Sequence, residues 1–489
     1  MTSGGLMQLV AYGAQDVYLT ANPQVTFFKQ LYRRHSNFAM ESIEQTFNGV
    51  ANFGKRVQAT ISRNGDLITR VYLQVTLPAI DDSILNTGSV TGSKFAWIPF
   101  LGQYLIDNVY VEIGGQTIDK HYGEWLHIWN ELTLPTGKQL AYLNMVNGYG
   151  GVVVEPADSC LTCATEVNVN DALRLACVNP WIQSQGTDCV FGNAVVAQAN
   201  DQASLTGCIP ERTLYIPLEF WFNRHVGLAL PLIALQYHEV KINVEFNQLQ
   251  YLCNIEAGSG ETTAGILSKV AAQGLAACAL YVEYIYLDTE ERRRFAQVAH
   301  EYLIEQLQFT GTESVTSTSN KINLSLNHPV KELIWVVQNP SYVDCLSSRN
   351  CPWRYSDAQL GNPTAVAKIQ LNGQDRFAER EGDYFNYVQP YQHHTNTPAK
   401  GVNIYSFALK PEELQPSGSC NFSRIDNAVL NLTLTPATFK TNIDTLDAGR
   451  DASGDLEVGV QKVANVNVYA INYNVLRIMS GMGGLAYSN

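Results

Sequence analysis

The chain has 489 residues, a length that excludes one small domain and predicts two large domains or three of ordinary size. Hydrophobic residues make up 46% of it, enough for a full core, whereas charged residues make up only 16%, against about 25% in typical soluble proteins. The formal net charge of −13 argues against a DNA-coating role, because the chain as a whole does not attract nucleic acid. A surface rich in amides, hydroxyls and 25 tyrosines favours broad contacts with other protein.

The N-terminal segment lacks the basic region and the apolar stretch of a secretory signal, so we expect no such signal. The two longest apolar stretches, residues 226–237 and 270–282, are shorter than the roughly 18 residues that a membrane-spanning helix needs. Ten cysteines in this context predict mostly reduced, buried thiols in a protein made in the cytosol.

Strand patterns dominate after the first two dozen residues. Residues 55–61 (KRVQATI) and 71–77 (VYLQVTL) alternate with period two around the Asn64-Gly65 turn, which predicts a β-hairpin. Many short strands separated by Gly, Pro and Asn turns are typical of β-sandwiches and jelly rolls. The further strand patterns cover residues 108–113, 215–222, 239–246, 280–287, 321–326, 333–338, 368–371, 402–408, 428–434 and 464–471.

Two segments have helical patterns. Residues 122–131 place Trp125 and Trp129 four positions apart, on one side of a helix. Residues 289–298 (TEERRRFAQV) form a polar pattern with Thr289 as the expected N-cap. The fold is therefore predicted to be mostly strand.

An internal repeat is the most informative feature of the sequence, because four blocks recur in the same order. The first two matches share an offset of 263 residues, and the third and fourth have offsets of 258 and 188. The decrease in offset from 258 to 188 means that the first half has about 70 extra residues between the third and fourth blocks, within residues 132–213. The matched blocks are residues 61–64 with 324–327, 71–74 with 334–337, 111–116 with 369–374, and 233–246 with 421–434.

The repeat predicts two copies of one β-sandwich joined by the polar helix at residues 289–298. Insertions in sandwiches map to loops, so residues 132–213 are expected to form a protrusion or a partner contact at one end of the first copy.

Cysteines in the insertion raise the question of a metal site. Cys160 and Cys163 have the C-x2-C spacing that holds one side of a zinc ion, and Cys177, Cys189 and Cys208 follow. The second C-x2-C pair is missing and no histidine is near, so ordinary thiols or an occasional disulfide are the preferred interpretation. Whether Cys160, Cys163, Cys177 and Cys189 pair or bind metal stays open.

An acidic loop at residues 444–457 offers oxygen ligands of the kind that calcium prefers. Its spacing does not fit an EF-hand, so a solvated loop is the favoured interpretation. The carboxylates are Asp444, Asp447, Asp451, Asp455 and Glu457.

The sequence contains none of the usual motifs of serine hydrolases, zinc proteases or P-loop enzymes. His393 and His394 are adjacent, and neighbours on a strand face opposite sides, so joint ligation of a metal is not expected. We therefore predict no enzymatic activity, no cofactor and no metal.

Two basic clusters, residues 33–35 and 292–294, lie near acidic residues, which favours ion pairing or solvated faces. Glycosylation sequons at Asn323, Asn421 and Asn431 are the candidate modification sites. Asn323 and Asn431 fall within predicted strands and Asn421 just before one, so the secretory route of glycosylation is not favoured.

Seven segments between residue 6 and the C-terminus resemble the major capsid proteins of nucleocytoplasmic large DNA viruses, most closely those of the chloroviruses of algae. The segments are residues 9–22 (LVAYGAQDVYLTAN), 26–43 (TFFKQLYRRHSNFAMESI), 227–241 (GLALPLIALQYHEVK), 287–309 (LDTEERRRFAQVAHEYLIEQLQF), 369–377 (IQLNGQDRF), 415–427 (QPSGSCNFSRIDN) and 473–489 (YNVLRIMSGMGGLAYSN).

The resemblance implies an all-β fold of two consecutive eight-stranded antiparallel jelly-roll β-sandwiches, a double jelly roll, with few short helices in loops and linker. Together with the repeat it predicts four parts along the chain. These are an N-terminal inner-face segment at 1–24, a first jelly roll at 25–287 with a long loop insertion at 132–213, a linker helix at 288–299, and a second jelly roll at 300–489.

The resemblance also implies a homotrimer that forms a pseudo-hexagonal capsomer, contacts neighbouring capsomers and minor capsid proteins, and tiles an icosahedral capsid over an internal membrane. The N-terminal segment is expected close to that inner membrane without a spanning helix, and no direct contact with nucleic acid is implied. The family has no catalytic residues to carry over, and its members are made in the host cytoplasm. This sequence departs from the family mainly in residues 132–213 and 341–366, so no glycan or host-contact residue is assigned there.

Two alternatives remain at this point. Paired jelly rolls also occur in glycan-cleaving amidases, which place acidic residues at the sandwich interface. A soluble jelly-roll lectin would bind sugar as a monomer. A released-glycan assay and a sugar-binding titration separate these alternatives from the capsid protein.

Overall fold

The structure is a computed structural model, and it describes residues 4–85, 93–147, 195–196, 208–209, 211–340, 343, 350, 352–357, 361–439 and 463–487. The chain divides into two compact units, Met1–Phe38 and Ala39–Asn489. The first unit holds two short helices, α1 (Gly4–Val10) and α2 (Val17–Thr20), neither of which buries a residue.

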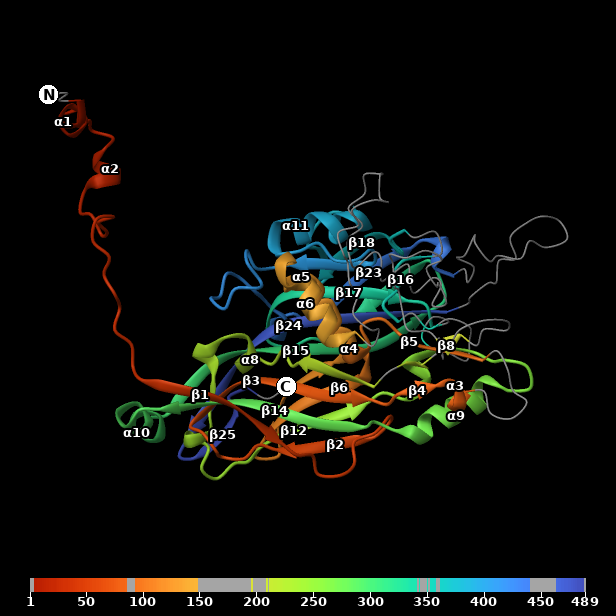
Figure 1. The fold of residues 1–489 in the computed structure, drawn as a ribbon. Coiled ribbons are helices and arrows are strands. Elements are labelled where there is room, and N and C mark those ends of the chain that lie inside the picture. The colour runs from red at the N-terminus through yellow and green to blue at the C-terminus, as the bar shows by residue number, and fades with distance from the viewer. Residues whose placement is uncertain are drawn as a thin grey trace. The chain divides into compact units, whose positions relative to one another are not determined.

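The first half of the second unit is a sandwich of two antiparallel sheets (Figure 1). One sheet has the strand order β1-β14-β3-β10, with β11 paired to β3, and the other has the order β2-β12-β6-β7. The strands are β1 (Phe38–Gln45), β2 (Arg56–Thr60), β3 (Leu67–Leu77), β6 (Ile106–Ile113), β7 (Gln116–Tyr122), β10 (Arg212–Pro217), β11 (Leu230–Pro231), β12 (Val240–Phe246) and β14 (Ala277–Leu287).

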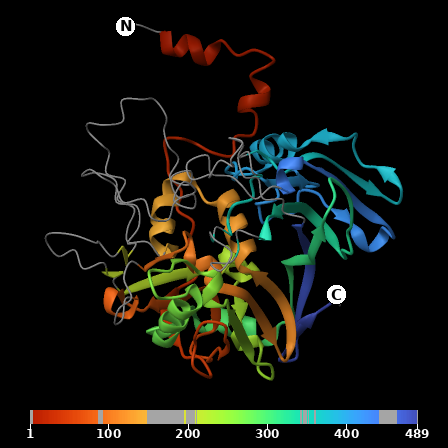
Figure 2. The same cartoon turned by 90° about the vertical axis from the view of Figure 1, so that its right-hand side faces the viewer.

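The second half is another sandwich (Figure 2). Its sheets have the orders β15-β24-β17-β21, with β22 and β25 added, and β16-β23-β18-β19, with β20 added. The strands are β15 (His300–Val315), β16 (Ser319–Asn323), β17 (Pro329–Gln338), β18 (Thr364–Leu371), β19 (Gln374–Asp375), β20 (Arg380–Glu381), β21 (Val402–Ser406), β22 (Cys420–Asn421), β23 (Ala428–Leu434), β24 (Ala464–Met479) and β25 (Met482–Leu485).

The two sandwiches have the same topology. Without the short added strands β11, β20, β22 and β25, each sandwich has eight strands. Taken in chain order, the first, eighth, third and sixth form one sheet, and the second, seventh, fourth and fifth form the other. Eight antiparallel strands arranged in this way form a jelly roll. The predicted fold class, two consecutive jelly rolls, is confirmed.

The predicted hairpin at residues 55–77 is wrong, although both of its strands exist. β2 pairs with β12 and β3 pairs with β14 and β10, so the two strands belong to opposite sheets. Val57 of β2 and Leu73 of β3 both point into the core between those sheets. The alternating pattern correctly identified two half-buried strands, but it carries no information about which strand each one pairs with.

Both predicted helices are confirmed, as α5 (Gly123–Thr133) and α10 (Thr289–Gln297). The N-cap of α10 is Asp288 and not Thr289, because the Asp288 carboxylate accepts a hydrogen bond from the Thr289 backbone N–H at 2.7 Å. The structure adds two eleven-residue helices that were not predicted from the sequence, α6 (Thr136–Val146) and α9 (Thr263–Gln273).

Several short elements complete the described chain. The small sheets are β13-β5-β8 and β4-β9, built from β4 (Ile80–Asp81), β5 (Lys94–Trp97), β8 (Val195–Val196), β9 (Cys208–Ile209) and β13 (Cys253–Glu256). The short helices are α3 (Asp82–Leu85), α4 (Leu101–Leu105), α8 (Trp221–Arg224), α11 (Gln389–His393), the π-helix η5 (Tyr384–Val388), and the 3-10 turns η1 (Val226–Leu228), η2 (Leu232–Ala234), η3 (Leu249–Tyr251), η6 (Phe422–Arg424) and η7 (Pro436–Phe439). Among the described residues, no helix combines the length and the apolar character needed to cross a bilayer.

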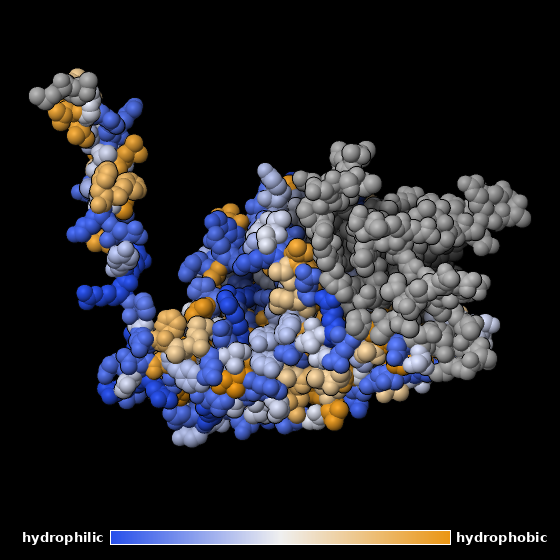
Figure 3. Space-filling model, in the orientation of Figure 1, coloured by the Kyte–Doolittle hydropathy of each residue, from blue (hydrophilic) through white to orange (hydrophobic). Residues whose placement is uncertain are grey.

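Each sandwich encloses its own hydrophobic cluster, and the first cluster extends across the boundary between them. Ile304 of β15 and both Leu476 and Ile478 of β24 pack into the core of the first sandwich. The second unit therefore behaves as one body with two sandwich cores. Its face in Figure 3 mixes hydrophilic and hydrophobic residues, as its charge-poor composition leads one to expect.

Candidate functional site: the junction between the two sandwiches

Helix α5 connects the two sandwiches because it is apolar on two sides. Leu126 enters the core of the first sandwich. Four other side chains, spaced along one side of the helix, pack on the outer face of the sheet formed by β24, β17 and β21; these are Trp125, Ile128, Trp129 and Leu132. They contact Ile334, Val336, Val402, Ile404, Tyr469 and Ile471.

Glu124, at the start of α5, adds a polar contact to the same junction. Its carboxylate accepts hydrogen bonds from the Tyr469 hydroxyl and, at 2.7 Å, from the Asn467 side-chain amide. Loss of water around the carboxylate raises the pKa of Glu124, and the two hydrogen bonds oppose that effect. The bonds hold α5 in register on β24.

A chain of charges lies beside the helix and also spans the junction. Arg224 of α8 lies 3.1 Å from one oxygen of Glu305 on β15, and the Lys331 ammonium of β17 lies 2.5 Å from the other. Lys331 also donates to the backbone carbonyl of Pro411 at 2.6 Å. The Arg224 guanidinium stacks 4.1 Å above the Trp129 ring, a cation–π contact between α8 and α5.

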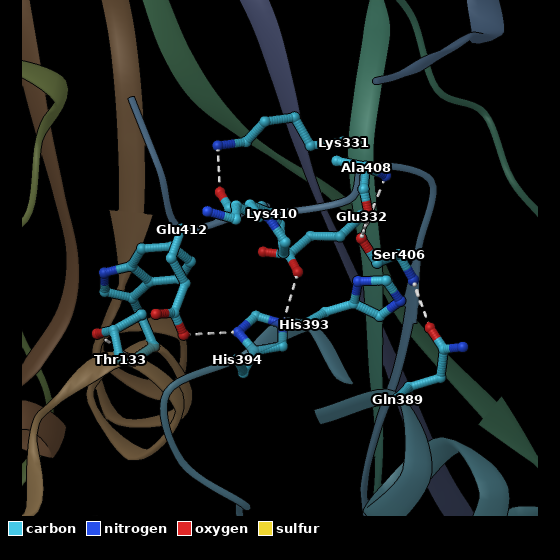
Figure 4. Close-up of polar contacts among 12 residues, drawn as sticks. Thr133, Lys331, Glu332, Gln389, His393, His394, Ser406, Ala408, Lys410 and Glu412 are labelled. Atoms are coloured by element: carbon cyan, nitrogen blue, oxygen red, sulfur yellow. Dashed lines mark hydrogen bonds and ion pairs between the residues drawn. The ribbon is translucent and has the colours of Figure 1, made fainter. Parts of the chain in front are cut away.

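A second buried charge cluster lies around His394 (Figure 4). Its ring nitrogens lie 2.8 Å from a Glu332 oxygen and 2.9 Å from a Glu412 oxygen. Burial alone would lower the pKa of His394, but the two carboxylates raise it to about 9. Burial likewise opposes ionisation of Glu412, yet hydrogen bonds from His394 and Thr395 hold its pKa below the ordinary value. His394 is therefore protonated, and Glu412 is ionised, at neutral pH.

The two adjacent histidines do not lie on a strand, which corrects the sequence-based placement. His393 ends α11 and His394 follows it. The His393 ring contacts the backbone carbonyl of Leu409 at 2.9 Å, whereas His394 contacts the two carboxylates, so the rings serve different partners (Figure 4). Within the described part of the chain, no three His, Cys, Asp or Glu side chains form a group that could hold a metal ion.

The charged residues of this junction were not predicted from the sequence. Lys331 and Glu332 lie in the otherwise apolar run of β17, and both are fully buried. Two adjacent charges inside a strong strand pattern are the available signal, because charged residues are almost never fully buried unless they are paired. Chemically the arrangement fixes one sandwich against the other, since the Arg224–Glu305 ion pair and the apolar contacts of α5 join elements of both.

The candidate glycosylation sites lie in strands of the second sandwich. Asn323 ends β16 and is exposed, and Asn421 lies in β22, where its side-chain oxygen accepts from the Ser423 backbone N–H at 3.0 Å. Asn431 in β23 is half-buried, and its amide donates to Gln370 at 3.1 Å. Their modification remains a prediction.

The other candidate residues are only partly covered. Cys160, Cys163, Cys177, Cys189 and the acidic loop at 444–457 lie outside the described residues, and Cys208 is in β9. Among described cysteines, Cys278 and Cys420 are free thiols, and the Cys253 thiol donates to the backbone carbonyl of Leu249 at 3.3 Å.

In the basic cluster of α10, the predicted local ion pairing is present. Arg292 lies 2.9 Å from the buried Asp66, and Arg293 lies 3.8 Å from Glu290 on the same helix. The contact with Asp66 ties α10 to the first sandwich.

Two family models match the chain. The model described as the major capsid protein N-terminus matches residues 26–288, and that of the large eukaryotic DNA virus major capsid protein matches residues 291–484. Among relatives, the chain is 47% identical to the major capsid protein of Phaeocystis pouchetii virus and 42% identical to that of Paramecium bursaria Chlorella virus 1. Both alignments cover 100% of this chain and 100% of the relative.

Solved structures agree with these sequence matches. The crystal structure of PBCV-1 VP54 is 35% identical, with a TM-score of 0.66 over 95% of this chain and 100% of that one. The Faustovirus major capsid protein is only 13% identical yet has a TM-score of 0.63 over 97% of this chain and 96% of that one, which shows a shared fold.

Proposed function

The chain belongs to the family of large eukaryotic DNA virus major capsid proteins, and we propose that three copies of it form a pseudo-hexagonal capsomer. It is a structural component of the virion capsid, as are its relatives. In this proposal the capsomers pack side by side into an icosahedral shell over an internal membrane, and the protein is made in the host cytoplasm before assembly.

The observation that carries the proposal is the pair of topologically identical sandwiches in one body. Three such chains present six nearly equivalent sandwiches, which permits hexagonal packing around a unit that has only threefold symmetry. The junction around α5 supports it, because the relation between the two sandwiches must be constant for six of them to form a regular ring.

The exposed apolar side chains of the first unit support a role at the inner face of the shell. Leu9, Tyr18 and Leu19 are each more than three-quarters exposed. We assign residues 1–24 to contacts with minor capsid proteins near the membrane, and keep 25–287, 288–299 and 300–489 as the first jelly roll, the linker helix and the second jelly roll.

Sedimentation velocity of the purified full chain tests the proposal. We expect a species of three times the chain mass that persists on dilution, together with flat hexagonal arrays in electron micrographs at high concentration. A chain that remains monomeric at every concentration would contradict the proposal. Release of glycans from a glycoprotein would favour the amidase alternative instead.

A further inference from the structure

The described part of the chain contains a second sheet face that corresponds to the face under α5. α5 lies between the fifth and sixth strands of the first sandwich and covers the outer face of the sheet β15-β24-β17-β21. One cross-strand row of that face consists of Ile404, Ile334 and Tyr469, which are at most 2% exposed under the helix.

In the topologically equivalent sheet of the first sandwich, β1-β14-β3-β10, no hydrophobic cluster formed by the described residues encloses the corresponding row. Its matching cross-strand row consists of Pro217, Tyr72 and Tyr281. The offset of 188 residues that aligns β12 with β23 also aligns Tyr281 with Tyr469. This alignment identifies which row of the first sandwich corresponds to the row under α5. Tyr72 and Tyr281 stack at 5.2 Å and are half-buried, and the neighbouring Tyr215 is 41% exposed.

This outer face is also hollowed. A depression of about 510 Å³ lies against β3 and β10, lined by Tyr72, Tyr215, Pro217 and Met145 and bordered by Arg70. An apolar hollow with stacked aromatic rings on a sheet face is a surface suited to another protein element.

The second sandwich carries the element that corresponds to α5. The helical segment η5–α11 lies between its fifth and sixth strands, as α5 does in the first. Leu126 of α5 and Phe385 of η5 each enter the core of their own sandwich, so they align the two segments.

With that alignment, the residues of α5 that cover a sheet correspond to exposed residues of η5–α11. Positions two, three and six after the aligned residue are Ile128, Trp129 and Leu132 in α5, which are 0%, 4% and 0% exposed. The same positions in η5–α11 are Tyr387, Val388 and Tyr391, which are 38%, 40% and 84% exposed.

We propose that η5–α11 of one copy docks on the outer face of β3, β10 and β14 of a second copy and thereby repeats between chains the contact that α5 makes within each chain. The inference rests on the proposed trimer. The interface is heterologous, with a helix from one chain and a sheet from the next, so it closes a ring in which internal and external junctions alternate.

The chemistry of the two surfaces fits this role. The internal contact is aliphatic and tryptophan-rich, whereas both surfaces of the external contact are rich in tyrosine, which tolerates water before assembly and buries its ring afterwards. The exposed Asp383, just before η5, also provides a charge opposite to that of Arg70 beside the hollow.

Single substitutions on either surface test the contact. Tyr391→Asp on the helix and Tyr215→Asp on the sheet should each raise the concentration needed for half-maximal trimer by at least about tenfold in sedimentation velocity. Because both side chains are exposed in the single chain, thermal unfolding of the monomer should not change. Val50→Asp, at a similarly exposed position (78%) outside both surfaces, is the matched control and should trimerise like wild type.

A cross-link gives a second readout. The double variant Tyr215→Cys, Tyr391→Cys should form covalent chain-to-chain products with a short bismaleimide, well above the background of the native cysteines and of either single variant. If both aspartate variants trimerise like Val50→Asp and the cross-link is absent, the contact is wrong while the trimer stands. A wild-type chain that never trimerises overturns both.

Discussion

Lys331 is fully buried, and its ammonium group depends on Glu305 and the Pro411 carbonyl for the interactions that water would otherwise provide. Lys331→Met should therefore lower the free energy of unfolding by roughly 3 kcal/mol, because the Glu305 carboxylate loses one of its two cationic partners in a buried place. Urea denaturation monitored by tryptophan fluorescence measures the loss.

The matched control is the exposed pair Lys410 and Glu413, whose charged atoms lie 2.7 Å apart. Lys410→Met removes an ion pair of similar length that remains in water, so it should cost less than about 1 kcal/mol. Equal losses from the two substitutions would show that burial does not govern the Lys331 contact.

His394 predicts a pH dependence of stability. Its pKa is raised from about 6.5 in the unfolded chain to about 9 in the folded one, so the folded state binds the proton more tightly. The resulting stabilisation is complete below about pH 6.5 and is lost as the pH rises through about 9. As the pH is raised from 6.5 to 9.5, we expect the urea concentration at the unfolding midpoint of the wild type to decrease. The corresponding loss in the free energy of unfolding should reach roughly 3 kcal/mol.

His394→Gln should remove most of this alkaline slope and lower the stability at pH 6.5. His393→Gln is the control, because His393 contacts only a backbone carbonyl among the described polar partners and should leave the slope unchanged. The same slope in the wild type and in His394→Gln would assign the pH dependence to another group.

The burial of Lys331 and Glu332, and the identity of their partners, could not be predicted from the sequence. The pattern of residues 329–338 predicts a strand, and β17 is one, but the pattern cannot say that both Lys331 and Glu332 are buried. Their partners are Glu305 of β15, the Pro411 carbonyl and His394 after α11, which only the tertiary fold brings together.

At the level of elements, we expect α5 to contribute most to the stability of the junction between the two sandwiches. Trp125 is fully buried, yet it belongs to neither sandwich core, since it packs between them. Trp125→Ala should cost about 3–5 kcal/mol and should split calorimetric unfolding into separate transitions for the two sandwiches. Tyr487→Ala, at an exposed aromatic residue (63%), should change neither. One unaltered transition in Trp125→Ala would contradict the role of α5 as the connecting element.

The repeat was predictable from the sequence, but the residue-by-residue alignment of its two copies was not predictable at every strand. In three of the four matched blocks the aligned residues face the core in both copies, as with Val111 and Ile369, or Ile242 and Leu430. The remaining block pairs Val71, which is in the core, with Ile334, which faces α5. A shift of one residue reverses the faces of a strand, and β17 is apolar on both faces, so its pattern could not reveal the error.

The two missed helices of eleven residues have physical explanations. α6 follows Pro135 within the insertion and buries only Tyr142, Leu143 and Val146, so its apolar stripe is short. In α9, the apolar run at 270–282 continues past the helix end at Gly274 and into β14, which concealed the boundary. Apolar runs that span two elements show no clear period.

At the scale of the molecule, the resemblance and the repeat together predicted the two jelly rolls, because both depend on strand order along the whole chain. How the sandwiches meet was not predictable, since the junction combines α5, α8 and the ends of β15 and β24 from distant parts of the sequence. The junction accounts for the second unit being one body despite its two topologically complete sandwiches.

That junction leads to a prediction about the isolated second sandwich. A fragment of residues 300–489 would lose α5 and the first core, and so would expose Ile334, Ile404, Tyr469 and the Leu476 end of β24 to water. An apolar face of this kind promotes association, so we expect the fragment to aggregate and to bind a hydrophobic dye strongly, whereas the full chain should not. The variant fragment Ile334→Thr, Ile404→Thr should be more soluble and bind less dye, because both substitutions lie on the uncovered face. A soluble, monodisperse wild-type fragment without dye binding would show that the second sandwich does not need the cover that α5 provides.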